Sequence, residues 1–181
     1  NSDDRKPCDN VATSRAKFDY KDLRPVGVTS WRNVSGAGGI YSSVHDLSKW
    51  MNAQLAGGEI PGSGGKRLFS AQRQREMWTM LTPIPVGKPS VPELAAAAPN
   101  FLGYAQGWQL SDYAGHRLVW HTGGWPGQVS RLTLLPDARI GVVVLTSAEA
   151  GVAFNAITYE ALDMMLGTGG HDWLKGYAAA F

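Results

Sequence analysis

The sequence predicts an α+β domain in which an antiparallel sheet packs against helices. Segments with apolar residues at helical spacing come first, and segments rich in Val, Leu, Trp and Thr follow them before a last helical part. The two final strand-like segments are separated by only four residues, which favours antiparallel pairing. Hydrophobic residues make up 44% of the 181 residues and charged residues 18%, which excludes a disordered or collagen-like chain.

Two helices are expected in the first half of the chain. Apolar residues recur there at spacings of three and four: Val44, Leu47, Met51 and Leu55. Ser43 is placed to cap this helix, and Gly57 follows its end. Ser70 is placed to cap a second, shorter helix that ends before Pro83. Residues 1–34 are polar, and we expect an irregular lead-in that runs over the surface.

The second half is predicted to form the sheet. Four segments have strand-like composition, at residues 104–110, 117–121, 128–135 and 140–147. The unbroken apolar run Val142–Leu145 predicts that the last strand is covered on both faces. Residues 150–166 are predicted to form a helix that stops at Gly167, and residues 171–180 a short final helix.

Charge and composition argue against several classes of function. Seventeen basic side chains are nearly balanced by 15 acidic ones, which gives no basic cluster of the kind that nucleic acid requires. The single cysteine, Cys8, excludes an internal disulfide or a multi-cysteine metal site. His116 and His121 are five apart in an extended segment and point to opposite faces, so we expect no metal and no cofactor. Arg131 is expected to be solvated.

The ends of the chain suggest part of a longer protein. It begins at Asn1 rather than Met and shows no basic segment followed by an apolar one, as a secretory signal would have. Trp173 and Phe181 lie on a final helix that stops abruptly. No stretch approaches the roughly 18 to 20 apolar residues of a membrane span, so none is expected.

The most informative stretch is Trp120–Gly127, with the sequence WHTGGWPG. A strand that ends in His121-Thr122 and runs into Gly123-Gly124 exposes its backbone N–H groups, because no side chains shield them. Fixed N–H groups at a strand edge are what an oxyanion hole requires. From the residues alone, the favoured interpretation is a Gly-rich turn between two strands, with His121 as an ordinary surface histidine.

Two stretches resemble a known family. Ala37–Trp50, with the sequence AGGIYSSVHDLSKW, resembles the segment that enters a helix in class C-like serine β-lactamases. Their relatives include penicillin-binding-protein-like enzymes: esterases, D-alanyl-D-alanine carboxypeptidases and D-aminopeptidases. Further on, His121-Thr122-Gly123 resembles the third motif of that family, Lys-Thr-Gly or its His variant. The resemblance implies that residues 35–181 are the C-terminal portion of a β-lactamase/transpeptidase-like catalytic domain.

The resemblance implies a role for each motif residue. His121 replaces the motif lysine beside the nucleophile, and Thr122 contacts the acyl or carboxylate portion of the substrate. Gly123 keeps the strand edge open, and Gly124 supplies one oxyanion-hole N–H. Trp125, next to Gly124, either floors a substrate pocket or covers the turn. Since histidine is less reliably cationic than lysine near neutral pH, esters or D-amino-acid peptides are favoured over β-lactams.

The nucleophile of the family lies in Ser-x-x-Lys. Ser14–Lys17 and Ser63–Lys66 have this spacing, but neither opens an apolar helix or stands in the family's order, so both are interpreted as coincidences. No Tyr-x-Asn occurs either. We therefore expect a chain that is inactive alone and needs an N-terminal half of the domain, in cis or in trans.

Two functions are the main candidates at this point, and an interaction domain with neither function is a third possibility. The first is a part of a serine hydrolase that acts through an acyl-enzyme on a small-molecule or peptide substrate. The second is a catalytically inactive module of the same fold that binds peptidoglycan or peptides. Because family members usually act in the periplasm or outside the cell, a periplasmic or secreted location is expected.

Overall fold

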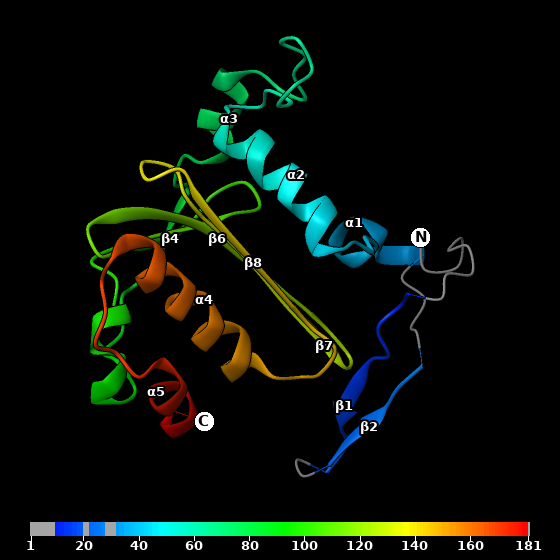
Figure 1. The fold of residues 1–181 in the computed structure, drawn as a ribbon, viewed down its shortest axis with the longest axis vertical. Coiled ribbons are helices and arrows are strands. Elements are labelled where there is room, and N and C mark those ends of the chain that lie inside the picture. The colour runs from blue at the N-terminus through cyan, green and yellow to red at the C-terminus, as the bar shows by residue number, and fades with distance from the viewer. Residues whose placement is uncertain (1–9, 20–21, 28–31, 181) are drawn as a thin grey trace.

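The computed structural model describes residues 10–19, 22–27 and 32–180. Its centre is a six-stranded antiparallel sheet in the order β3-β4-β5-β6-β7-β8 (Figure 1). These strands are, in order, Thr82–Pro83, Leu102–Tyr104, Gln109–Tyr113, His116–Trp125, Gln128–Leu135 and Ile140–Thr146. The predicted α+β fold with an antiparallel sheet is confirmed.

Helices cover the two faces of the sheet. Helix α2 (Val44–Leu55) packs on one face and α4 (Gly151–Leu166) on the other, and both contact β8 (Figure 1). The shorter helical segments are α1 (Ser35–Gly38), α3 (Ala71–Met77), α5 (Trp173–Ala179), and the 3₁₀ turns η2 (Arg32–Val34) and η3 (Pro92–Ala97).

The predicted helix ends are confirmed. The Ser43 hydroxyl accepts the Asp46 N–H at 3.2 Å at the start of α2, and Ser70 caps α3 in the same way. Gly167 ends α4 with a φ of 68°, a left-handed conformation that glycine adopts readily. These signals are local, which is why the sequence reveals them.

The register of the sheet separates two cores. One core lies between the sheet and helices α4 and α5: Tyr113, Leu118, Leu135, Val142, Val144, Ala156, Tyr159, Leu162 and Trp173. The second lies on the α2 face: Met51, Trp78, Ala105, Trp108, Leu110, Val119 and Leu134. Because neighbouring strand residues alternate, His121, Gly123 and Trp125 share the α2 face with Val119. Thr122 and Gly124 lie on the α4 face.

Three sequence-based predictions about the strands are corrected. The segment 104–110 is not one strand, because a turn at residues 105–108, with Gly107 at φ 77°, separates β4 from β5. Strand β6 does not end at His121 but pairs with β7 as far as Trp125. The run in β8 is not covered on both faces to its end, since Leu145 is 39% exposed where α2 leaves the sheet open.

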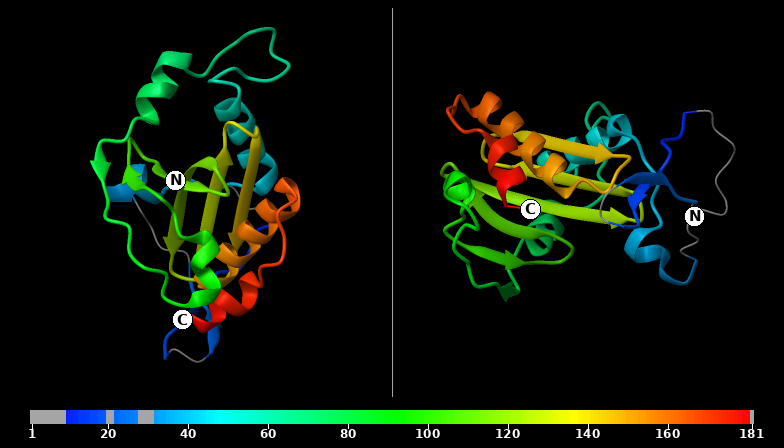
Figure 2. Two further views of the ribbon diagram at one scale, coloured as in Figure 1. Left: turned by 90° about the vertical axis from the view of Figure 1, so that its left-hand side faces the viewer. Right: turned by 90° about the horizontal axis from the view of Figure 1, so that it is seen from below.

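The N-terminal segment is more regular than predicted. Strands β1 (Arg15–Lys17) and β2 (Leu23–Pro25) form a hairpin beyond the ends of β6 and β7 (Figure 2). The Arg15 N–H donates to the Gly127 carbonyl at 3.0 Å, and the Arg15 carbonyl accepts the Glu149 N–H at 3.2 Å. The hairpin is therefore attached to the β6–β7 turn. The boundary between residues 34 and 35 stays a prediction, and Cys8 lies outside the described residues.

Candidate functional site

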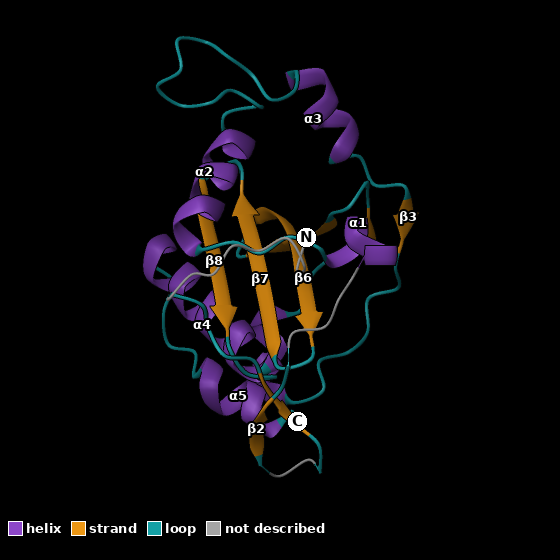
Figure 3. Cartoon of the chain, turned by 90° about the vertical axis from the view of Figure 1, so that its right-hand side faces the viewer, coloured by secondary structure: helices purple, strands orange, loops and turns teal. Residues whose placement is uncertain are grey.

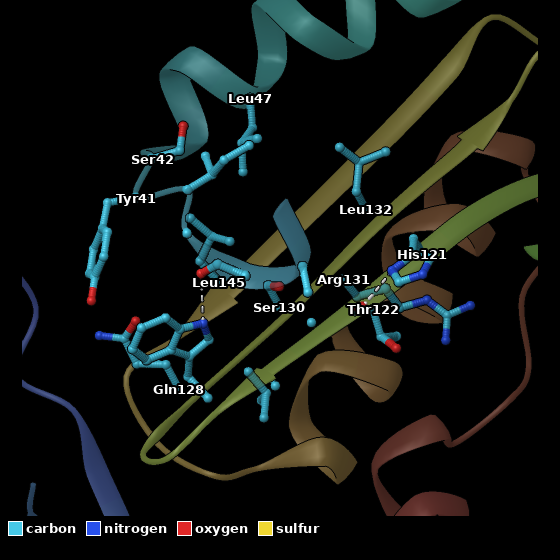
Figure 4. A pocket seen from close by; sticks show the side chains of 18 of the residues that line it. Tyr41, Ser42, Leu47, His121, Thr122, Gln128, Ser130, Arg131, Leu132 and Leu145 are labelled. Atoms are coloured by element: carbon cyan, nitrogen blue, oxygen red, sulfur yellow. Dashed lines mark hydrogen bonds between the residues drawn. The ribbon is translucent and has the colours of Figure 1, made fainter. Parts of the chain in front are cut away.

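A groove of about 550 Å³ runs along the α2 face of the sheet at the far end of β6. Figure 3 looks onto β6, β7 and β8, with α2 beside β8 and α1 beyond β6. Apolar side chains form much of the groove: Leu47, Leu132, Val143 and Leu145. Residues 35–42 and His121–Trp125 also line the groove, and Figure 4 shows Tyr41 at one side of it and His121 at the other.

The pairing of β6 decides where the backbone groups of the motif point. Trp125 and Gln128 flank a two-residue turn, so they form a hydrogen-bonded pair. Hydrogen-bonded and non-hydrogen-bonded pairs alternate along an antiparallel ladder, so Gly123 forms a hydrogen-bonded pair with Ser130 of β7. The N–H and C=O groups of Gly124 and Thr122 then point to the opposite edge.

That opposite edge of β6 loses its strand partner beyond the start of β5, and α1 lies beyond β6 (Figure 3). Strand β5 begins at Gln109, which pairs with Trp120, and within the described residues no strand continues alongside β6 beyond this pair. The N–H of Gly124 is therefore not consumed by the ladder and lies next to the groove. This is the placement that an oxyanion-hole donor requires, although the role itself stays a prediction.

His121 lies at the point where the edge opens. Its Nδ1 is 2.6 Å from the Thr122 carbonyl oxygen, and its Nε2 is 3.2 Å from the Tyr104 hydroxyl. Tyr104 comes from the end of β4, and nothing in its sequence context links it to His121. Only the pairing of β4, β5 and β6 brings the two side chains together.

The remaining motif residues divide between the two faces. A Cβ at Gly123 would lie 2.6 Å from the Ser130 hydroxyl, so glycine leaves room for that side chain in the groove. Trp125 donates its Nε1–H to the Gly38 carbonyl at 3.0 Å and contacts the Tyr41 ring edge-on. Trp125 thus both lines the groove and holds α1 against β6. Thr122 lies on the α4 face, apart from the side chains of His121 and Trp125.

Arg131 is buried, and the prediction that it is solvated is wrong. It lies opposite Thr122 on the α4 face and is 4% exposed. Its guanidinium carbon is 4.4 Å from the Trp120 ring and 5.4 Å from the Tyr159 ring. Its Nε–H donates to Thr133 at 3.1 Å. A cation stacked between aromatic rings is stabilised by their π faces, which explains how this charge is held inside.

Neither Ser-x-x-Lys spacing forms a catalytic arrangement. Ser63 lies in a turn, where its hydroxyl donates to the Lys66 carbonyl at 3.3 Å. Ser14 precedes a strand rather than a helix, and its carbonyl accepts the Val26 N–H. Both agree with the interpretation that these spacings are coincidental.

Among residues 10–19, 22–27 and 32–180, no group of three or more His, Cys, Asp or Glu side chains could hold a metal ion. None of the described helices is both long and apolar enough to cross a membrane.

Fold and site together define the class of protein: a domain with the β-lactamase and penicillin-binding-protein-like fold. The structure of the octameric penicillin-binding protein homologue from Pyrococcus abyssi superposes with a TM-score of 0.69 at 23% identity. The match covers 92% of this chain and 32% of that one. Residues 2–163 match the Beta-lactamase family, and the chain belongs to this family.

The sequence relatives are hydrolases of fungi. The unguisins hydrolase ungD' of Aspergillus campestris is 29% identical over 158 residues, which are 84% of this chain and 27% of the relative. The unguisins hydrolase ungD of Aspergillus violaceofuscus is 29% identical over 155 residues, 80% of this chain and 26% of the relative. The chain thus spans about a quarter of the length of these relatives.

Proposed function

We propose that the chain is the C-terminal part of the catalytic domain of a serine hydrolase that works through an acyl-enzyme. In this role it contributes the third-motif strand and one oxyanion-hole donor. The observation that carries the proposal is the Gly124 N–H, which points away from β7 at an open edge beside the groove. Such a donor needs no reorientation when negative charge develops on an acyl oxygen.

The nucleophile must then come from another segment. A Ser-x-x-Lys serine opens an apolar helix, and the groove beside Gly124 offers Leu132, Val143 and Leu145 as an apolar surface for one. The segment that carries it, in cis or from a second chain, would complete the site. His121 would then lie beside the reacting serine, and the outward backbone groups of Thr122 would face the substrate.

The candidate substrates and the cellular location are part of the same proposal. Esters, D-amino-acid peptides and β-lactams are the candidate substrates, and unguisins join them because the fungal relatives are hydrolases of unguisins. A periplasmic or secreted location is proposed for the whole protein.

The second candidate function is a binding module without catalysis. It is favoured by the open edge itself, since the outward N–H and C=O groups of Thr122 and Gly124 can pair with an extended peptide. The residues encoded ahead of Asn1 separate the two functions. Ser-x-x-Lys and Tyr-x-Asn there support the hydrolase, and their absence supports the binding module.

The kinetic test starts with the chain alone. We expect no turnover of p-nitrophenyl acetate or nitrocefin, and activity that is lost on Ser14→Ala or Ser63→Ala would overturn the proposal. In the protein extended by the residues encoded ahead of Asn1, Gly124→Pro removes the N–H and should lower kcat by about 100-fold or more. Gly124→Ala keeps the N–H and meets nothing within 4 Å, so it is the matched control with near wild-type kcat. Equal kcat values in the two variants would contradict the oxyanion role.

A further inference from the structure

We infer that Tyr104 is the positioning residue of His121, and that the two side chains together cap the outward carbonyl of Thr122. The cap occupies the hydrogen-bond acceptor that lies next to the Gly124 N–H on this edge of β6. This inference rests on the proposed function of that edge, but the geometry of the cap can be tested separately from it.

The hydrogen bonds of His121 determine its tautomer. A carbonyl oxygen only accepts, so the 2.6 Å contact with the Thr122 carbonyl requires a proton on Nδ1. In the neutral ring, Nε2 is then an acceptor, and the Tyr104 hydroxyl at 3.2 Å donates to it. The chain of donors therefore runs from Tyr104 through His121 to the edge of β6.

Tyr104 is placed for this contact by the sheet. It pairs with Gln109, the first residue of β5, and Gln109 pairs with Trp120. Tyr104 therefore lies level with the last paired position of β6, and its ring reaches past the start of β5 to His121. The two ring centroids are 6.1 Å apart and the rings meet edge to face, which adds an aromatic contact to the hydrogen bond.

The cap changes what the edge presents to a ligand. Beyond the last pair with β5, the outward groups of β6 follow in the order Thr122 N–H, Thr122 C=O, Gly124 N–H and Gly124 C=O. The carbonyl of Thr122 is thus a neighbour of the Gly124 N–H, and its lone pairs would repel an anion bound there. A hydrogen bond from His121 Nδ1 occupies this carbonyl and reduces the repulsion.

The Tyr104 hydroxyl can keep the ring in place in both protonation states. It donates to Nε2 of the neutral imidazole and can accept from the Nε2–H of the imidazolium. The Nδ1–H bond to the Thr122 carbonyl is present in both states. Tyr104→Phe would keep the ring contact but lose this second anchor.

Long-range ¹H–¹⁵N correlation spectra of the chain test the geometry directly. With the neutral imidazole, wild-type His121 should show only the Nδ1–H tautomer. In Tyr104→Phe the signal should become a mixture with the Nε2–H tautomer. His116 is the internal control, because it lies on the same strand but is bonded to Asp137, and it should not change. An Nε2–H tautomer in the wild type, or an unchanged His121 in the variant, would overturn the inference.

A kinetic measurement in the extended protein tests the consequence of the cap. Tyr104→Phe should lower kcat and leave KM near its wild-type value, because the cap acts on charge that develops in the transition state. The loss should be smaller than the roughly 100-fold expected for Gly124→Pro, since the donor itself remains. An unchanged kcat alongside a strong Gly124→Pro effect would overturn the cap and leave the proposed function standing. If Gly124→Pro has no effect, the proposed function fails, while the spectra still decide the tautomer.

Discussion

The two faces of the sheet differ in how completely they are closed. On the α4 face, Leu118, Leu162 and Trp173 are at most 1% exposed, and even Arg131 is enclosed. On the α2 face, the groove reaches the sheet at the end of β6, and Leu145 remains 39% exposed. Both faces have buried cores, since Val119 and Leu134 on the α2 face are 0% exposed, but the α2 face also carries the groove at the end of β6.

A buried carboxylate illustrates the closed face. Asp163 of α4 accepts hydrogen bonds from Tyr113, Thr168, His171 and Trp173, which join β5, α4 and α5. Burial disfavours the charged form, but these hydrogen bonds together outweigh it and hold the pKa of Asp163 below its usual value. The same burial, together with Asp163, raises the pKa of Tyr113.

The largest contrast is expected between two tryptophans. Trp173→Ala removes a side chain that is 1% exposed and should cost about 3–5 kcal/mol of unfolding free energy. Trp125→Ala at the groove loses a hydrogen bond to Gly38 and part of a ring contact, and should cost about 1 kcal/mol. Urea unfolding of the two variants measures their unfolding free energies. Equal losses in the two variants would contradict the difference in closure between the two faces of the sheet.

The second contrast concerns pH. Because the folded pKa of Asp163 lies below its ordinary value of 3.8, the carboxylate stabilises the fold above that pH, and this contribution is lost as the pH falls through the folded pKa. Asp163→Asn should cost about 1.5–3 kcal/mol near neutral pH. The difference in unfolding free energy between wild type and variant should become smaller below about pH 4. Unfolding free energies measured across pH 3 to 6 check this, and a gap that widens on acidification would refute it.

The smallest contrast separates two glycines of the β6–β7 hairpin. Gly127 has a φ of 80°, and a Cβ there would lie 2.5 Å from the Arg15 nitrogen. Gly127→Ala should therefore cost at least about 1–2 kcal/mol. Gly124→Ala meets nothing within 4 Å and should change stability by less than about 0.5 kcal/mol. Thermal unfolding compares the two variants, and a greater loss of stability in Gly124→Ala would contradict the space around Gly124.

Sequence-based prediction succeeded where the signals are local. Capping serines at 43 and 70, the helical spacing of α2 and the glycine after α4 depend on residues within one or two turns, and all are confirmed. The extent of β6 was missed, because the pairing that carries the strand on to Trp125 comes from β7.

The candidate site shows the same limit. The motif residues His121–Trp125 stand out in the sequence, but their division between two faces depends on the register with β7. Tyr104 is 17 positions from His121 in the sequence. Arginine is a residue type that usually lies at the surface, so nothing in the sequence indicates that Arg131 is buried. Neither could be placed without knowing which strands are neighbours.

The amino-acid sequence by itself determined the fold class, the helix ends and the stretch that bears the motif, because propensity, capping and spacing act over a few residues. Only the tertiary structure decided which backbone groups of that stretch remain open. This depends on where β5 begins relative to β6, a long-range pairing that leaves no local pattern in the chain. The contact between Tyr104 and His121 has the same origin, since it forms only when three strands align.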